Sequence, residues 1–266
     1  MFADLENGTE MAASSHNSSS KPVAVVTGAT GGLGAQICRA LADAGFVVVA
    51  GYRSSADAAY VLVDSLGGTD HCALAAPVTD SASIRLFAEA VSTRYRRCDV
   101  LVNCAGTTRF VPHDDLEGVD DALIDDVLAT NVRGPFAMVR ALRPLLEKSD
   151  LLGGGVVVNI SSIAAQTAMG SNVIYCASKA AIDNLTKSLA RALAPAIRVL
   201  SVSPGLVDTE FVKSMDSGWR NDQANRTPLG RLAQPEEIAH AVLVAVRDMR
   251  FSTGCVLPVD GGRPLK

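Results

Sequence analysis

The sequence predicts an α/β protein built on one doubly wound, seven-stranded parallel sheet. Short runs of β-branched residues alternate with longer stretches of helical periodicity, and most of the short runs are apolar almost throughout. Strands that are apolar on both faces are typical of a parallel sheet covered by helices on both sides. The predicted strands are residues 22–27, 46–51, 71–76, 99–104, 155–160, 197–202 and 255–259.

Helical periodicity marks the stretches between these strands, chiefly residues 33–45, 81–96, 120–147, 172–194 and 235–249. Strand and helix alternate without an internal repeat or a linker rich in Pro, Gly and Ser. Residues 21–266 are therefore expected to form a single domain. Residues 1–20 are polar and rich in Ser and Asn, so a disordered tail is expected there.

Composition excludes several classes of protein. The 266 residues include 24 Lys and Arg against 28 Asp and Glu, a formal net charge of −4, which gives no basic footprint for nucleic acid or an anionic membrane. No apolar run is long enough to span a bilayer, and the acidic start of the chain is unlike a signal peptide, so a cytoplasmic protein is expected. The 6 cysteines and 4 histidines are scattered without metal-ligand spacing, so we expect reduced thiols and no bound metal.

A glycine-rich turn follows the first predicted strand and opens the first predicted helix. Gly28, Gly32 and Gly34 allow a tight turn and a close backbone approach, and the N–H groups at a helix N-terminus favour an anion. In this strand–turn–helix context, the turn predicts a Rossmann-like site for the pyrophosphate of a dinucleotide. The expected contacts are Gly28, Thr30, Gly31, Gly32, Leu33 and Gly34.

The end of the second predicted strand indicates which dinucleotide binds. In an NAD-binding unit an acidic residue holds the ribose hydroxyls there, but this chain has Tyr52, followed by Arg53 and Ser54. An arginine can bind a 2′-phosphate through two parallel N–H bonds, and a serine hydroxyl adds a donor. We expect all three residues to contact the cofactor and NADP(H) to be preferred over NAD. The alternative is that Arg53 is only a solvated loop charge.

A second set of polar residues predicts proton-transfer chemistry. Tyr175 and Lys179 are four residues apart in a predicted helix, which puts both side chains on one face, and Ser162 lies thirteen residues before Tyr175. Hydride reduction of a ketone needs a proton donor for the developing alkoxide. An ammonium about 4 Å from a phenol favours the ionised phenol by about 4 kcal/mol at an effective dielectric of about 20. A serine hydroxyl can donate a hydrogen bond to the substrate oxygen as its charge grows.

These motifs resemble the short-chain dehydrogenase/reductase family, and 3-oxoacyl-carrier-protein reductases within it. The nucleotide turn has the family's TGxxxGxG form, the fourth strand ends in its NAG element with Cys104 as a departure, and the matches cover about residues 22–262. The resemblance implies that Lys179 also holds the nicotinamide ribose and that Asn131 positions a water that passes protons to Lys179. The implied catalytic residues are Asn131, Ser162, Tyr175 and Lys179.

The resemblance also implies further cofactor contacts. Where the family places an adenine-binding Asp after the third strand, this chain has Pro77, which leaves the contact to the backbone of Val78. The remaining implied contacts are Asn103, Ala105, Gly106, Pro204, Gly205, Val207 and Thr209, besides Tyr175 and Lys179. Related enzymes pair their long helices and their last strand across two-fold axes, so a homotetramer is expected.

Three functions are open at this point. The sequence favours an NADP(H)-dependent reductase of a small-molecule carbonyl, with a sugar or polyol dehydrogenase of the same fold as the alternative. A non-catalytic NADP-sensing regulator is the third, and the complete set of catalytic residues argues against it. Substrate specificity is expected in loops 107–113, 164–173 and 207–227. In the last loop Phe211, Met215 and Trp219 predict a helical apolar stripe, which either faces the core or closes over substrate.

Overall fold

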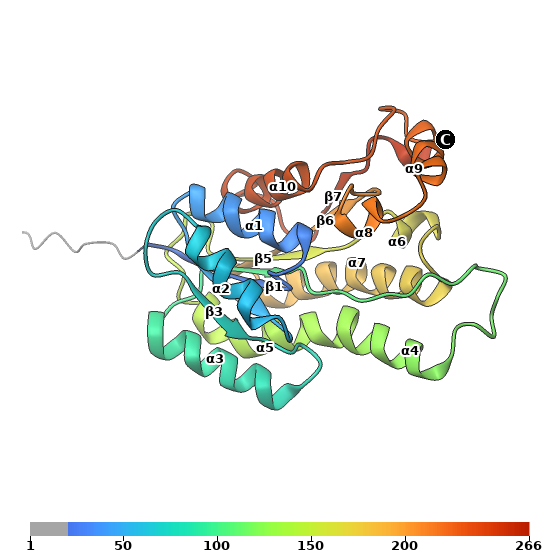
Figure 1. Ribbon diagram of the computed structural model, residues 1–266. Helices are drawn as coiled ribbons and strands as arrows, with labels where there is room; N and C mark the ends of the chain where they lie inside the picture. The colour runs from blue at the N-terminus through green and yellow to red at the C-terminus, as the bar shows by residue number, and fades with distance from the viewer. Residues whose placement is uncertain (1–20, 266) are drawn as a thin grey trace, which may run out of the picture.

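The computed structural model describes residues 21–265, in which one seven-stranded sheet carries helices on both faces (Figure 1). The strands are β1 (Val23–Thr27), β2 (Val47–Tyr52), β3 (Cys72–Ala75), β4 (Val100–Asn103), β5 (Gly155–Ile160), β6 (Ile197–Pro204) and β7 (Val256–Val259). Their order is β3-β2-β1-β4-β5-β6-β7, and every pair is parallel. The doubly wound fold is confirmed, while the predicted tail, residues 1–20, lies outside the described residues.

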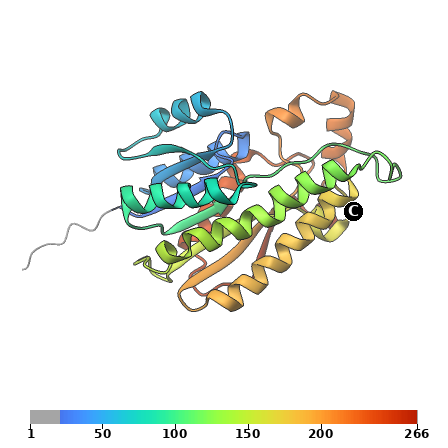
Figure 2. The same ribbon diagram turned by 90° about the horizontal axis from the view of Figure 1, so that it is seen from below.

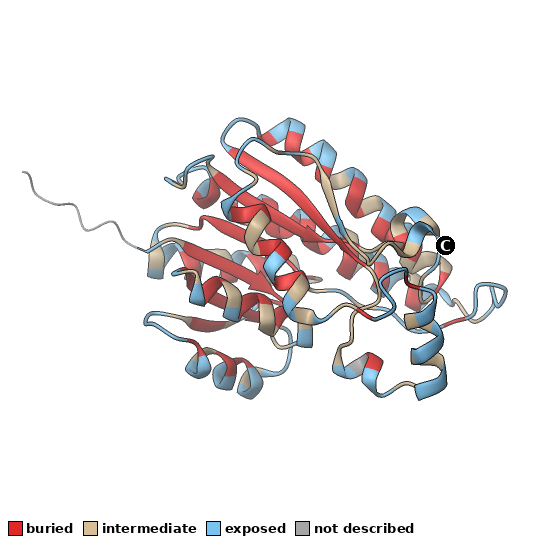
Figure 3. Cartoon of the chain, turned by 90° about the horizontal axis from the view of Figure 1, so that it is seen from above, coloured by how far each residue is buried: buried red, intermediate tan, exposed pale blue. Residues whose placement is uncertain are grey.

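Apolar side chains fill both faces of the sheet. Successive strand residues point to opposite sides, so Val26 and Val48 lie in the core on one side and Val25 and Val49 in the core on the other. The first side is covered by α1 (Gly32–Asp43), α2 (Ala56–Ser65) and α10 (Pro235–Arg247). The second is covered by α3 (Ser81–Tyr95), α5 (Gly134–Leu146) and α7 (Val173–Leu193), which lie side by side in Figure 2. Figure 3 shows the resulting pattern, with buried strands inside helices that expose their outer faces.

The helix predicted over residues 120–147 is interrupted. A π-helical turn (Ala129–Arg133) separates α4 (Asp121–Leu128) from α5, and the N–H of Gly134 donates to the carbonyl of Ala129, five residues earlier. The widened turn carries Asn131, whose side chain is buried. Apolar residues continue at helical spacing on both sides of the turn, which is why the sequence predicts one regular helix.

The expected apolar stripe also has a different structure. Two short helices, α8 (Glu210–Lys213) and α9 (Ser217–Asn225), replace one continuous helix. Asp216 accepts the N–H of Trp219 at 2.9 Å and so begins a new helix after a break. The prediction of a single helical stripe is therefore wrong, and the side chain of Phe211 lies outside the described part of the structure.

The carboxyl ends of the strands meet along one edge of the sheet. Thr27 at the end of β1 pairs with Gly51 of β2 and with Asn103 of β4. Loops from the ends of β4, β5 and β6 therefore converge at this edge, where α6 (Ala164–Thr167), α8 and α9 also lie (Figure 1). Within residues 21–265, no helix is long and apolar enough to cross a bilayer.

Candidate active site

Two glycines shape the turn between β1 and α1. Gly28 has a φ of +66°, and a Cβ atom there would lie 2.8 Å from the Cα atom of Ala105. A Cβ atom at Gly34 would lie 2.2 Å from the carbonyl oxygen of Gly28. Any larger residue at either position would force the turn away from the end of β4 or from α1.

No side chain of the described residues caps the N-terminus of α1. Its N-cap residue is Gly31, whereas Asp80, Asp120 and Asn172 cap α3, α4 and α7 with their side chains. Unpaired N–H groups and the helix dipole favour an anion at such an end. The turn and the first residues of α1 therefore fit the pyrophosphate of a dinucleotide.

Buried polar residues join the ends of the central strands. The Thr27 hydroxyl oxygen accepts the N–H groups of Cys104 and Ala105, each at 3.1 Å, and so fixes the start of the loop after β4. The Asn103 Nδ2 donates to the Asn159 Oδ1 at 2.9 Å. The Asn103 Oδ1 is buried and has no hydrogen-bond partner among the described residues. Thr27 is not among the site residues predicted from the sequence, although its place at the end of the first strand, directly before Gly28, could have indicated it.

A cleft of about 720 Å³ opens at this edge of the sheet. Its size is in the range of small-molecule sites in proteins. The three loops expected to carry specificity all contribute residues, from Thr107 in the first to Arg226 in the last. Of the predicted site residues, the cleft brings together Leu33, Gly106, Ser162, Tyr175, Lys179, Pro204, Gly205, Val207 and Thr209.

Tyr175 and Lys179 project from the first turns of α7. Asn172 accepts the N–H of Tyr175 at 2.7 Å and fixes the turn that carries it. Lys179 is buried, and its Nζ donates to the carbonyl oxygen of Ile160, the last residue of β5, at 2.8 Å. The Nζ lies 5.6 Å from the centre of the Tyr175 ring, so a positive charge stands beside the phenol.

The two adjacent serines after β5 have different environments. Ser161 is buried, and its hydroxyl donates to the carbonyl oxygen of Lys179 at 3.4 Å. Ser162 is half-buried, and its Oγ accepts the N–H of Ala164 at 3.1 Å. That bond leaves the Ser162 hydroxyl proton free to be donated into the cleft, so Ser162 is the serine suited to bind a ligand oxygen.

Asn131 lies behind the wall of the cleft and does not line it. Its Oδ1 accepts the N–H of Thr107 at 2.8 Å, while its Nδ2 donates to the Thr107 carbonyl at 3.0 Å and to the Ser178 hydroxyl at 3.1 Å. Both amide protons are therefore used within the protein, and one lone pair of Oδ1 is left. A Cβ atom at Gly106 would lie 3.5 Å from this Oδ1 and 4.0 Å from the Lys179 Nζ, so both groups face the same point beside Gly106.

The residues expected to choose between dinucleotides lie beside the nucleotide turn and outside the cleft. Tyr52, Arg53 and Ser54 follow Gly51, which pairs with Thr27. Desolvation, and then the neighbouring Tyr60, raise the pKa of the Tyr52 phenol, which keeps it neutral. Arg53 is exposed, and in the part of the chain that the structure describes its side chain has no hydrogen bond or ion pair.

The segment after β3 is held by a helix cap. Asp80 accepts the N–H of Ser83 at 2.7 Å, and its bonds to Ser83 and Ala82 lower the pKa of its carboxyl group. The side chain of Val78 is buried against Gly134, so only its backbone is available to a ligand. Asp80 is thus occupied by α3 and does not replace the acid that is missing at Pro77.

Comparison with known proteins assigns the chain to a class that suits this geometry, the NAD(P)H-dependent oxidoreductases. A family model described as enoyl-(acyl carrier protein) reductase matches residues 28–263. The chain belongs to the short-chain dehydrogenase/reductase family.

Relatives with different names are similarly close. The chain is 38% identical to D-threitol dehydrogenase from Mycolicibacterium smegmatis, over 92% of this chain and 93% of that protein. It is also 38% identical, over 92% of this chain and 96% of the relative, to a Streptomyces violaceoruber protein that carries the name of a granaticin polyketide synthase ketoacyl reductase. The solved structure of 3-ketoacyl-(acyl-carrier-protein) reductase from Brucella melitensis, complexed with NADH, has a TM-score of 0.83 and 30% identity, covering 91% of this chain and 98% of that one.

Proposed function

We propose that this enzyme transfers a hydride between NADP(H) and a small-molecule carbonyl or secondary alcohol, acting chiefly as a ketoreductase. The observation that carries the proposal is the placement of Tyr175 and Lys179 in the same cleft as Ser162, next to a glycine turn that fits a pyrophosphate. The relatives named as ketoacyl reductases support it.

In this proposal each side chain moves or holds a proton at one oxygen. The nicotinamide cofactor, when bound, supplies or accepts the hydride. Tyr175 donates its phenolic proton to the carbonyl oxygen during reduction and takes it back during oxidation. Ser162 donates a hydrogen bond to the same oxygen as negative charge develops there. Lys179, held by the Ile160 carbonyl, keeps a positive charge beside the phenol and has two more protons with which to hold the nicotinamide ribose.

Asn131 has two parts in the proposal. Its side chain accepts the N–H of Thr107 and donates to the Thr107 carbonyl oxygen, and these two bonds fix the loop after β4. The lone pair left on its Oδ1 is the site for a water that passes protons to Lys179. Because Gly106 has no side chain, the point that both the Asn131 Oδ1 and the Lys179 Nζ face holds no Cβ atom, which leaves a place for this water.

The proposed preference for NADP(H) is based on Arg53. Its guanidinium at the end of β2 is exposed and has no partner among residues 21–265, which suits a 2′-phosphate, and Ser54 adds a hydroxyl donor. The structural neighbour complexed with NADH makes NAD the alternative. The other proposed cofactor contacts are Gly28, Thr30, Gly31, Gly32, Leu33, Gly34, Val78, Asn103, Ala105, Gly106, Tyr175, Lys179, Pro204, Gly205, Val207 and Thr209.

The second candidate function is oxidation of a polyol, which the similarity to D-threitol dehydrogenase favours. The test is turnover in both directions, with NADPH or NADH and activated ketones, and with the oxidised cofactors and polyols. Faster turnover of ketones than of polyols supports the ketoreductase. Cofactor binding without turnover in either direction would instead indicate a nucleotide-sensing regulator.

We also propose that the chain forms a homotetramer in the cytoplasm. β7 is an edge strand in which Val256, Leu257 and Val259 are only partly buried within one chain, so a second copy can cover them. The 6 cysteines are all free, which suits a reducing compartment. Light scattering tests the assembly, since a mass near 27.7 kDa would show a monomer.

A further inference from the structure

Two arginines from separate parts of the chain line the cleft. Arg226 follows α9, and Arg263 lies in the 3-10 turn Arg263–Leu265 near the end of the chain. The Arg263 guanidinium donates to the carbonyl oxygen of Gln223 at 2.8 Å and to its Oε1 at 2.6 Å, which holds it against α9. Arg226 is exposed, and no hydrogen bond or ion pair of its side chain occurs within residues 21–265.

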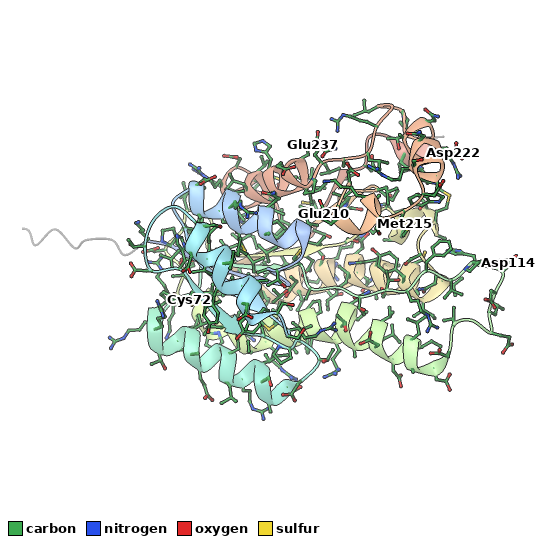
Figure 4. The ribbon with its side chains drawn as sticks, viewed as in Figure 1. Cys72, Asp114, Glu210, Met215, Asp222 and Glu237 are labelled. Carbon is green, nitrogen blue, oxygen red and sulfur yellow. The ribbon has the colours of Figure 1, made fainter. Side chains whose placement is uncertain are left out.

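These positive charges have no acidic counterpart in the cleft. None of its lining residues in the described chain is Asp or Glu, whereas Lys179 adds a third positive charge to the two arginines. The acids nearest in sequence to the two arginines have other partners or positions. The Asp260 Oδ1 accepts the N–H of Gly262 at 2.8 Å, and Asp222 lies on α9 at the outer edge of the molecule in Figure 4.

The two arginines also act on each other. Burial, and then the charge of Arg226, lower the pKa of the Arg263 guanidinium. Two like charges held close together without a counter-ion are stabilised by an anion that binds both. The anionic parts of a dinucleotide have other partners in the proposed function, namely the α1 N-terminus for the pyrophosphate and Arg53 for a 2′-phosphate. The anion at Arg226 and Arg263 is therefore a different one.

We propose that Arg226 and Arg263 bind an anionic group, a carboxylate or a phosphate, that the substrate carries away from its reacting carbonyl. The proposal rests on the ketoreductase function and specifies its substrate class. An arginine fork matches either anion through two parallel hydrogen bonds. Met215 and Trp219 line the same cleft and offer apolar surface for the carbon chain of the substrate, and Figure 4 shows Met215 between α8 and α9.

The first test compares matched substrates. An ω-keto carboxylate, its methyl ester and the corresponding keto phosphate are reduced with NADPH by the wild type and by Arg226→Gln. We expect the wild type to prefer one or both anions over the ester. Arg226→Gln should lower kcat/KM for that anion by about 10- to 150-fold and leave kcat/KM for the ester unchanged. The ratio of kcat/KM for the keto carboxylate to kcat/KM for the keto phosphate shows which of the two anions the site prefers.

The control variant is Arg191→Gln, which removes the same charge from an exposed position on α7. It lies sixteen residues beyond Tyr175, roughly 24 Å along the helix, and should behave as the wild type with all three substrates. Equal kcat/KM for the ester and both anions in the wild type would overturn the proposal. So would an equal loss for ester and anions in Arg226→Gln.

A binding measurement separates this proposal from the proposed function. Trp219 is the one tryptophan of the sequence and lines the cleft, so its fluorescence reports binding without turnover. The wild type with bound oxidised cofactor should bind the keto carboxylate or the keto phosphate more tightly than the ester, and Arg226→Gln should lose this difference. If no ketone is reduced but the difference is seen, the ketoreductase proposal fails and the anion site stands. If ketones are reduced but no difference is seen, the anion site fails alone.

Discussion

The Nζ of Lys179 is bound to the carbonyl oxygen of Ile160, and Ser162 follows Ile160 by two residues. The end of β5 therefore positions both groups. The carbonyl of its last residue binds the lysine, and the backbone that continues from it carries the serine. A buried ammonium needs such a fixed acceptor, because an unpaired buried charge is costly. The sheet, rather than α7 alone, holds the charged group beside Tyr175.

Replacing Tyr175 by phenylalanine should remove the proposed proton donor without changing the shape of the cleft. We expect kcat to fall by at least about 100-fold, with cofactor affinity nearly unchanged, when hydride transfer limits the rate. Tyr95→Phe is the matched control, because Tyr95 ends α3, donates to the Asp70 carbonyl oxygen at 2.6 Å and does not line the cleft. Wild-type kcat in Tyr175→Phe would show that another group supplies the proton.

Arg53→Ala should weaken NADPH binding and leave NADH binding unchanged. A charge-assisted contact with the 2′-phosphate predicts a loss of about 10- to 150-fold in affinity for NADPH. Tyr52→Asp should move the preference further toward NADH, because a carboxylate repels the phosphate and accepts the ribose hydroxyls. Both affinities are measured by titration, with Arg39→Ala as a control for lost surface charge on α1. Equal NADPH affinity in Arg53→Ala and wild type would mean that Arg53 is only solvated.

His71→Ala should destabilise the outer strands of the sheet. The Nδ1 of His71 accepts the N–H of Val48 at 2.9 Å, and its Nε2 lies 3.0 Å from the Gly67 carbonyl oxygen. Removing the ring leaves the N–H of Val48 without its acceptor, so the free energy of unfolding should fall by about 1–3 kcal/mol. Urea unfolding measures the change. The exposed His240→Ala should stay within about 0.5 kcal/mol of the wild type, and a similar loss in both variants would contradict this account.

Glu237→Gln should change how stability depends on pH. Two hydrogen bonds lower the pKa of Glu237 from 4.5 to about 2: the bond from the Arg231 side chain has the larger effect, and the bond from the N–H of Gln234 has the next largest. Because the folded protein favours the ionised form, this contribution is complete above pH 4.5 and is lost as the pH falls toward 2. The difference in unfolding free energy between wild type and variant should be largest at pH 7 and shrink below pH 4.5. Glu236→Gln is the control, and a difference that stays constant with pH would exclude the ion pair as its source.

The strands and the main site residues could be predicted because their signals are local. Short apolar runs, rich in β-branched residues everywhere but in the third strand, locate all seven strands to within about two residues. The four-residue spacing predicts that Tyr175 and Lys179 lie together, and both line the cleft. The helix α2 was missed because its start in the Ser54–Ala56 region has the composition of a loop. The contact between Arg263 and Gln223 joins residues forty positions apart, and no local pattern encodes it. The anchoring of Lys179 by Ile160 was missed for the same reason, since a backbone carbonyl leaves no mark in the sequence.

The π-helical turn at Ala129–Arg133 has a consequence for changes in chain length. Such a turn holds one residue more than an α-helical turn between the same flanking segments. Deleting one residue here can restore a regular helix while α4 and α5 keep their places in the core, but it moves Asn131 away from Thr107 and Ser178. We therefore expect a one-codon deletion in this turn to leave the protein folded and to abolish turnover, because the surplus residue serves the placement of Asn131 rather than the stability of the helix.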